Sequence, residues 1–455
     1  MRRPLITSRR RLLMVSRWKT RLVFWTGAVA IGGAAGVFAR SADYAGHYFH
    51  LLLQFGWWLP LIVTPAGLVL VAYLTRKVLP GAEGSGIPQA IAALRSRHEP
   101  HRGVLLSIRI AIGKILLTLI GLLSGASIGR EGPTVHVGAA IMYSIGRIAK
   151  FPRHDIERGL ILAGGAAGIA AAFNTPIAGI VFGIEEMSQS FEEETSGTMF
   201  LAVVLAGIVA VAVLGDYTYF GRSHAAFHDL TNWVVVPICG VVGGAFGGVF
   251  SWIIVKGNRK LAPYVAKHPL YVAAACGIVV AAAGVLSHGA AFGTGYGAAK
   301  QLVTGVGHST VSYPLFKMVA TVASYFSGIP GGLFAPSLSV GAGLGDVLSR
   351  FLTQAPGTAV VLLAMVAYFS GVVQTPITAF VIVMEMTDNQ SMLLPLMATS
   401  FIAFGISSLI CKEPVYRALA EAYVYRGPEP KPEEMVGADI DEETTEEGEE
   451  PGDRV

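Results

Sequence analysis

The apolar segments of this chain recur almost from end to end, and several are too short to cross a bilayer. They lie at about residues 22–39, 51–75, 104–128, 133–149, 157–172, 176–184, 198–215, 233–255, 270–287, 314–328, 333–351, 358–373, 376–384 and 391–411. A helix that spans the hydrocarbon core needs about 20 residues. Shorter segments broken by glycine or proline indicate helices that stop midway, which are tolerated only where the exposed backbone lines a cavity.

A low charge content supports this interpretation. Only 14% of the 455 residues are charged and 53% are hydrophobic, and the mean hydropathy is +0.57. A soluble protein carries about 25% charged residues. We therefore predict a polytopic membrane protein.

The two ends of the chain carry opposite charge. Residues 1–21 hold eight arginines and lysines and no acid, which predicts a cytoplasmic N-terminal segment. A cleaved signal peptide, cut near "FARSA", is the alternative, but the many later spans favour a retained first helix. From Gly427 onward there are twelve acids and two bases, so residues 426–455 are predicted to be a disordered cytoplasmic tail.

The sequence contains an internal repeat. When Lys114 is placed over Lys317, "SGASIGREGPTVHVGAA" falls on "SGIPGGLFAPSLSVGAG", and after a three-residue slip "NTPIAGIVFGIEEM" falls on "QTPITAFVIVMEMT". We assign residues 22–215 and 216–425 to two membrane repeats. Transporters built from such repeats bind their substrate where the halves meet.

Three glycine-rich stretches are each expected to begin a helix: "GSGIP" from Gly84, "GREGP" from Gly129 and "GIPGGLFAP" from Gly328. The N-terminus of a helix carries a partial positive charge and free N–H groups, which bind anions without a full cation. Three such ends converging near the middle of the membrane predict a site that a halide can both enter and leave.

These stretches resemble, in order, the three signature sequences of the CLC family of chloride channels and proton-coupled chloride transporters. The resemblance covers about residues 20–425 and includes "VMEMTDN" and "KEPVYRAL". It implies an all-α polytopic protein of two inverted repeats with tilted and broken transmembrane helices. It also implies a homodimer in which each subunit has its own anion pathway.

The resemblance assigns anion-binding roles to named residues. Ser85 is similar to the serine whose hydroxyl donates to the central chloride, and Tyr416 to the tyrosine that donates from the opposite side. The alternatives are a helix cap for Ser85 and an interfacial anchor for Tyr416. The resemblance further implies main-chain N–H ligands in two places, the central site (Leu333 and Phe334) and an outer site (Arg130, Glu131 and Gly132).

Glu131 resembles the gating glutamate of the family. A carboxylate has the charge of the transported ion, so it can occupy an anion site until protonation removes its charge. The alternative is an ion pair between Arg130 and Glu131 that fixes the turn. We expect the Arg130 side chain in the outer vestibule, where it attracts anions.

A second acid bears on the choice between channel and exchanger. The repeat aligns Glu185 with Glu385, which predicts a structural role in both halves, whereas Glu186 faces Met386. Glu186 resembles the inner proton-transfer glutamate of the proton-coupled members. The alternative is that Glu186 only marks the end of a helix at the cytoplasmic surface.

Other patterns in the sequence have alternative interpretations. "GASIG" around Ser127 satisfies the G-x-S-x-G pattern of serine hydrolases, which needs a strand before it and a helix after it. Lys114 and Lys317 are expected to snorkel or to raise the potential along the pathway. His136 is a possible proton relay that more often packs or caps, and "GTGYGAAK" from Gly293 is predicted to be a loop.

The sequence therefore predicts a chloride/proton antiporter, with a passive voltage- or proton-gated chloride channel of the same fold as the alternative. We expect a multi-pass protein of the cell (inner) membrane with both termini in the cytoplasm. Its partners are chloride, protons, the lipid bilayer and a second copy of the chain. No enzyme activity, cofactor, metal or nucleic-acid partner is predicted.

Overall fold

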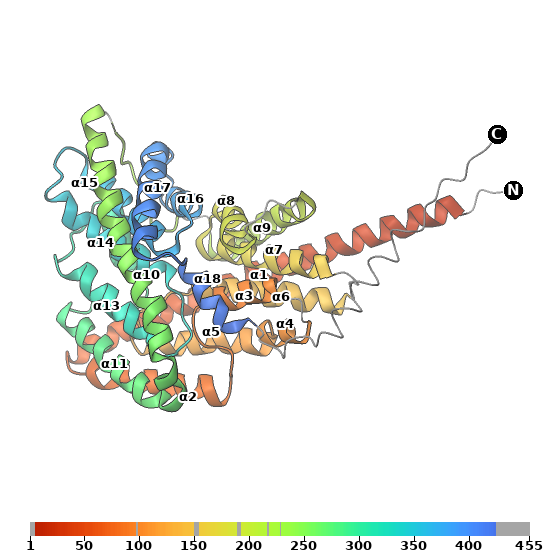
Figure 1. Ribbon diagram of the computed structural model, residues 1–455, viewed down its shortest axis with the longest axis horizontal. Helices are drawn as coiled ribbons and strands as arrows, with labels where there is room; N and C mark the ends of the chain where they lie inside the picture. The colour runs from red at the N-terminus through yellow and green to blue at the C-terminus, as the bar shows by residue number, and fades with distance from the viewer. Residues whose placement is uncertain are drawn as a thin grey trace.

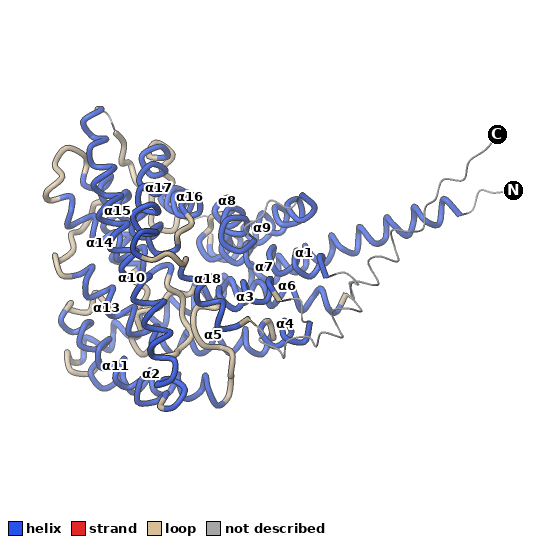
Figure 2. Tube along the Cα trace, in the orientation of Figure 1, coloured by secondary structure: helices blue, strands red, loops and turns tan. Residues whose placement is uncertain are grey.

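The protein is built from helices that pack into one body (Figure 1). The computed structural model describes residues 5–96, 99–149, 154–188, 193–215, 218–227 and 229–424. Within these ranges Figure 2 shows helices joined by loops, and the only strand-like pairings are two isolated bridges between loop residues. The predicted all-α fold is confirmed, whereas the acidic tail predicted at 426–455 lies outside the described residues.

The helices that precede residue 218 include the first matched set, which are the helices that the sequence repeat pairs with later ones. They are α1 (Leu5–Phe55), α2 (Pro60–Lys77), α3 (Ile87–Arg95), α4 (Glu99–Leu105), α5 (Ile108–Leu123), α6 (Glu131–Ile148), α7 (His154–Phe173), α8 (Pro176–Phe182), the π-helical turn η1 (Gly183–Ser188) and α9 (Glu193–Leu214).

The helices that follow residue 229 include the second matched set, which are the counterparts of the first. They are η2 (Leu230–Val234), α10 (Val235–Lys267), α11 (Pro269–Leu286), α12 (Tyr296–Val303), α13 (Tyr313–Phe326), α14 (Phe334–Ser349), α15 (Gly357–Val373), α16 (Pro376–Thr387), α17 (Leu393–Ile410), α18 (Val415–Ala420) and η3 (Glu421–Tyr423).

Several helical stretches are long and apolar enough to cross a bilayer. In the described chain they are Leu22–Phe55, Pro100–Leu123, Leu230–Lys267, Pro269–Leu286 and Leu393–Ile410. Three shorter apolar helices accompany them, at Phe200–Val213, Gly357–Val373 and Pro376–Thr387. The chain is thus a multi-pass membrane protein, and α1 belongs to its packed body because it contacts α5, α6, α7 and α9.

The repeat predicted from sequence is visible in the packing. α6 packs on α7, and their counterparts α14 and α15 pack on each other in the same way. α6 and α14 begin close together, but α6 extends toward the side from which α1 projects and α14 toward the opposite side (Figure 1). α15 is hydrophobic all round and is buried from Ala359 to Val373, as expected of a helix at the centre of a large core.

Two acids fasten the halves to each other. Glu185 accepts two N–H bonds, of 3.1 and 2.6 Å, from the first turn of α16. Glu385 accepts two, of 3.1 and 2.7 Å, from the first turn of α8. Each carboxylate therefore satisfies free N–H groups of the other half, and the structural role predicted for this matched pair is confirmed.

We expect Glu385→Ala to lower the free energy of unfolding by about 2 kcal/mol, because it removes two hydrogen bonds to a carboxylate. Denaturation of the purified protein in detergent measures this. The control is Glu421→Ala, which removes a carboxylate that is 60% exposed and lies 3.5 Å from Arg259, and whose loss should cost less than about 0.5 kcal/mol. Equal losses in the two variants would contradict the assignment.

Two buried lysines hold the loops that precede matched helices. The Lys114 Nζ donates to the carbonyl oxygens of Glu83 (3.1 Å) and Gly84 (3.3 Å), ahead of α3. The Lys317 Nζ donates to the carbonyl of Gly293 (2.7 Å), ahead of α12. Both lysines are fully buried, so the expectation that they snorkel is wrong. The effect of their charge on the anion pathway stays a prediction.

The segment "GTGYGAAK" is only partly the loop predicted from the sequence, because residues 296–303 form α12. Gly86 and Gly295 occupy equivalent places before α3 and α12, with φ of +100° and +77°. A left-handed conformation of this kind favours glycine. The loop before α12 is therefore the second-half counterpart of "GSGIP".

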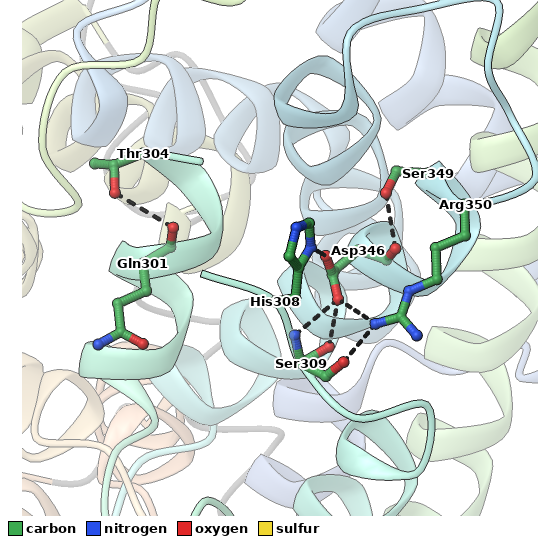
Figure 3. Close-up of polar contacts among 7 residues, drawn as sticks. All are labelled: Gln301, Thr304, His308, Ser309, Asp346, Ser349 and Arg350. Carbon is green, nitrogen blue, oxygen red and sulfur yellow. Dashed lines mark hydrogen bonds and ion pairs between the residues drawn. The ribbon is translucent and has the colours of Figure 1, made fainter. Parts of the chain in front are cut away.

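A polar cluster anchors the far end of α14 (Figure 3). One carboxylate oxygen of Asp346 accepts bonds from the N–H and the hydroxyl of Ser309, both at 2.8 Å, and from Arg350 at 3.0 Å. The other oxygen lies 3.0 Å from the Nδ1 of His308. The loop between α12 and α13 is thereby tied to the helix whose opposite end forms part of the candidate site.

Candidate functional site

The three glycine-rich stretches are bonded directly to one another. Gly129 and Gly332 exchange two N–H···O bonds of 2.7 Å, which join the starts of α6 and α14. Gly84 donates to the carbonyl of Ile329 and accepts from the N–H of Gly331, both at 3.2 Å, which joins the start of α3 to that of α14. The convergence predicted from the sequence is therefore present in the fold.

Close approach of the three backbones explains the glycine at position 132. A Cβ atom there would lie 2.8 Å from the Ser85 carbonyl oxygen and 3.3 Å from the Cα of Gly332. No side chain fits at the first distance. The first turn of α6 can thus come against the loops of both α3 and α14 only because residue 132 lacks a side chain.

Two buried hydroxyl groups face this junction. Ser85 and Tyr416 are 1% and 0% exposed, and their two hydroxyls lie near each other. Neither hydroxyl makes a hydrogen bond within the described part of the chain. The ring of Phe334 stacks on that of Tyr416 with centroids 5.8 Å apart. The structure thus brings together Ser85, Tyr416, Leu333, Phe334 and Gly132, as predicted, at the N-termini of α3, α6, α14 and α18.

The Glu131 carboxylate is fully buried in the same place. It faces the N–H of Ala335 in the first turn of α14, and its Oε1 accepts a hydrogen bond of 3.2 Å from the Tyr219 hydroxyl. A negative group therefore lies at the N-terminus of α14, where the helix dipole favours an anion.

The Arg130 side chain is bonded to α1. Its Nη1 donates to the carbonyl of Ala39 (2.6 Å) and to the carboxylate of Asp43 (2.7 Å), both on α1. The guanidinium is therefore bonded to Asp43, and its charge also acts on the Glu131 carboxylate. With only 6% of the residue exposed, the expectation of an open vestibule cation is wrong. Arg130 instead anchors the start of α6 to α1.

Glu186 lies in η1, the single π-helical turn that follows α8. Turns of this kind occur frequently at functional sites. The residue is 1% exposed, so the alternative of a helix end at the surface is wrong. Neither carboxylate oxygen has a hydrogen-bond partner in the described chain, and Arg417 and Arg95 are within electrostatic reach.

His136 has a structural environment. Its Nε2 lies 2.8 Å from the carbonyl of Leu105 at the end of α4, and its Cβ lies where a side chain at Gly86 would have to go. These contacts fit packing and capping rather than a proton relay.

A cavity of about 370 Å³ adjoins the loop that carries Ser85. Its lining includes Gly84, Glu83, Arg76, Tyr325 and Tyr423.

Two features of the site were missed in the sequence. The counterpart of "GSGIP" before α12 lies 209 residues along rather than 203, so a gap of six residues hid it, although the matched lysines were a usable signal. Tyr219 lies in no motif and contacts Glu131 across 88 positions. No pattern in the sequence pointed to it.

The protein is multi-pass and helical, and the starts of its broken helices meet at two buried hydroxyls. This arrangement is typical of membrane channels and transporters. Comparison with known proteins makes this specific. The chain belongs to the CLC family, because the family model described as voltage gated chloride channel matches residues 67–408.

Curated relatives cover most of the chain. The H(+)/Cl(-) exchange transporter ClcA of Vibrio campbellii is 30% identical over 384 residues, which are 80% of this chain and 79% of that protein. The H(+)/Cl(-) exchange transporter ClcA of Vibrio parahaemolyticus is 29% identical over 422 residues, which are 85% of this chain and 88% of that protein.

Solved structures share the fold. A slow cyanobacterial Cl-/H+ antiporter superposes with a TM-score of 0.77 at 23% identity, covering 90% of this chain and 98% of that one. A CLC-type fluoride/proton antiporter superposes with a TM-score of 0.74 at 21% identity, covering 88% and 97%.

The protein is thus not an enzyme, and the hydrolase alternative also fails on local structure. Ser127 follows helix α5 rather than a strand, and its hydroxyl is paired with that of Thr321 at 2.9 Å. The arrangement lacks the strand-to-helix turn that exposes a nucleophilic serine.

Proposed function

We propose that the protein exchanges chloride for protons across the membrane. In this proposal chloride and the Glu131 carboxylate compete for one site, and Glu186 passes protons between that site and the cytoplasm. The exchange activity named for the curated relatives supports chloride/proton exchange as the function.

The central anion position lies between the hydroxyls of Ser85 and Tyr416 and the N–H groups of Leu333 and Phe334. An outer position lies at the N–H groups of Arg130, Glu131 and Gly132. Two buried hydroxyls without a partner in the described chain support this assignment, because leaving such a group unpaired costs about 1–3 kcal/mol. An anion between them would accept both hydrogen bonds.

Glu131 acts as the gate because its carboxylate imitates the transported ion. Deprotonated, it is favoured at the N-terminus of α14, where it faces the N–H of Ala335. Protonated, it loses the charge that this site favours and leaves. The same side chain then admits chloride and carries a proton.

The observation that carries the choice of exchanger over passive channel is the burial of Glu186. A carboxylate that is 1% exposed and has no hydrogen-bond partner in the described chain is costly as an ion. It is well placed to take up and release a proton. Tyr416 lies within electrostatic reach of both Glu186 and Glu131, so both acids are near one residue of the anion site.

We also propose the repeat boundaries, the oligomeric state and the membrane orientation. Residues 22–215 and 216–425 form the two repeats, two copies of the chain form a homodimer, and both termini lie on the cytoplasmic side of the inner membrane. The basic residues of the segment 1–21 support this orientation.

Simultaneous recording of chloride and proton flux from reconstituted liposomes tests the proposal. With the membrane potential clamped, an imposed chloride gradient should drive protons uphill, in the direction opposite to chloride. Chloride flux without proton movement would identify the passive channel. Absence of chloride flux would contradict both functions.

A further inference from the structure

Tyr219 contacts the proposed gate from outside the four helices that form the anion site. It lies in the segment between α9 and η2, is 1% exposed, and donates its hydroxyl hydrogen to the Glu131 Oε1 at 3.2 Å. Glu131 belongs to the first matched set of helices. The segment that carries Tyr219 is fastened to the second.

That fastening is made by the backbone. The N–H of Phe220 donates to the carbonyl of Met386, and the N–H of Ser223 donates to that of Thr387, both at 3.0 Å. Both acceptors are in the last turn of α16. The position of the Tyr219 backbone is therefore set by a helix of the second matched set, whereas Glu131 lies in the first.

The ring of Tyr219 is held by other rings. It makes edge contacts with Phe173, Phe220 and Tyr296 at centroid distances of 5.1, 4.8 and 5.0 Å. Edge-to-face pairs of this geometry are favourable beyond the area that they bury. A ring enclosed in this way offers its hydroxyl from a fixed point.

The charged neighbours on this side of Glu131 are also fixed. The Arg130 guanidinium lies 5.9 Å from the centre of the Tyr219 ring and is bonded to Asp43 on α1. Tyr416 also lies within electrostatic reach of Glu131. A cation over the ring makes the tyrosine hydroxyl a better donor to a carboxylate.

We propose that Tyr219 is a positioning residue that holds deprotonated Glu131 in the anion site and so sets the chloride concentration needed to displace it. This inference rests on the proposed function, in which Glu131 and chloride compete. The hydroxyl favours the closed gate, because it bonds to the carboxylate only when that carboxylate occupies the site. Its removal should make chloride binding apparently tighter, by about tenfold.

A double-mutant cycle tests the proposal on the purified full-length protein, with chloride binding measured by calorimetry at pH 7.5. Tyr219→Phe removes one oxygen and keeps the ring, and is expected to lower the apparent Kd for chloride about tenfold. In a Glu131→Ala background the same change should have less than a twofold effect, because the competitor is absent. The matched control is Tyr296→Phe, whose hydroxyl faces Lys300 at 3.4 Å and whose removal should leave the Kd unchanged.

The pH dependence of chloride flux gives a second readout. A gate that has lost its hydrogen bond is protonated and released more easily, so Tyr219→Phe should move the midpoint of flux to higher pH, by up to one unit. Tyr296→Phe should leave the midpoint in place.

The outcomes separate the two proposals. If Glu131→Ala tightens chloride binding but Tyr219→Phe does not, the role of Tyr219 is wrong and the proposed function stands. If Glu131→Ala leaves the Kd unchanged, the competition itself is wrong. Equal effects of Tyr219→Phe and Tyr296→Phe would assign the result to aromatic packing and overturn the role of the hydroxyl.

Discussion

Replacing Glu131 by glutamine should leave chloride flux intact and abolish proton transport. The amide has nearly the shape of the carboxyl group but carries no charge and takes up no proton. It cannot compete with chloride as an anion does, and it cannot carry a proton through the site. Proton flux driven by a chloride gradient should fall by at least tenfold, and chloride flux should lose its dependence on pH. Parallel electrode recordings from liposomes measure both quantities.

The control for this prediction is Asp346→Asn. Asp346 is also a buried acid, with 3% of the residue exposed, but it lies at the opposite end of α14 and bonds to Ser309 and Arg350. Its replacement should reduce stability and preserve coupling. Proton transport that survives in Glu131→Gln would remove Glu131 from the proton pathway.

Replacing Glu186 by glutamine should also abolish proton transport, but with a different signature. Glu131 is intact in this variant and still competes with chloride, so chloride flux should remain dependent on external pH. Only the supply of protons from the cytoplasmic side is lost. The loss of coupling should again be at least tenfold, measured with the same two electrodes.

The adjacent residue supplies a matched comparison. Glu185→Gln alters an acid next to Glu186, but its carboxylate accepts two N–H bonds from α16. We expect lower thermal stability with coupling preserved. The reverse pattern, with coupling lost in Glu185→Gln and kept in Glu186→Gln, would exchange the roles of the two acids.

The sequence predicted the backbone of the site better than its side-chain partners. The glycine stretches and the repeat predicted three converging helix starts, because small residues, proline and helix polarity act over a few neighbouring positions. The matched acids Glu185 and Glu385 could also be assigned, since a shared position in both halves indicates a shared structural role.

Contacts between distant segments could not be predicted in this way. Arg130 was expected in an open vestibule, but it is bonded to Ala39 and Asp43 on α1, about 90 residues earlier. Lys114 and Lys317 were expected to snorkel, but backbone carbonyls lie within reach of their ammonium groups. In each case tertiary packing supplies a partner that no local pattern encodes, and a buried charge takes such a partner when one exists.

The crossed caps at Glu185 and Glu385 constrain how the molecule can work. Rocking of one half against the other would break four carboxylate bonds at one place and the paired bonds of Gly129 and Gly332 at another, all at once. These bonds therefore hold the two halves rigidly together. We therefore expect the transport cycle to proceed on a nearly stationary scaffold, with displacements confined to single side chains and the solvent around them.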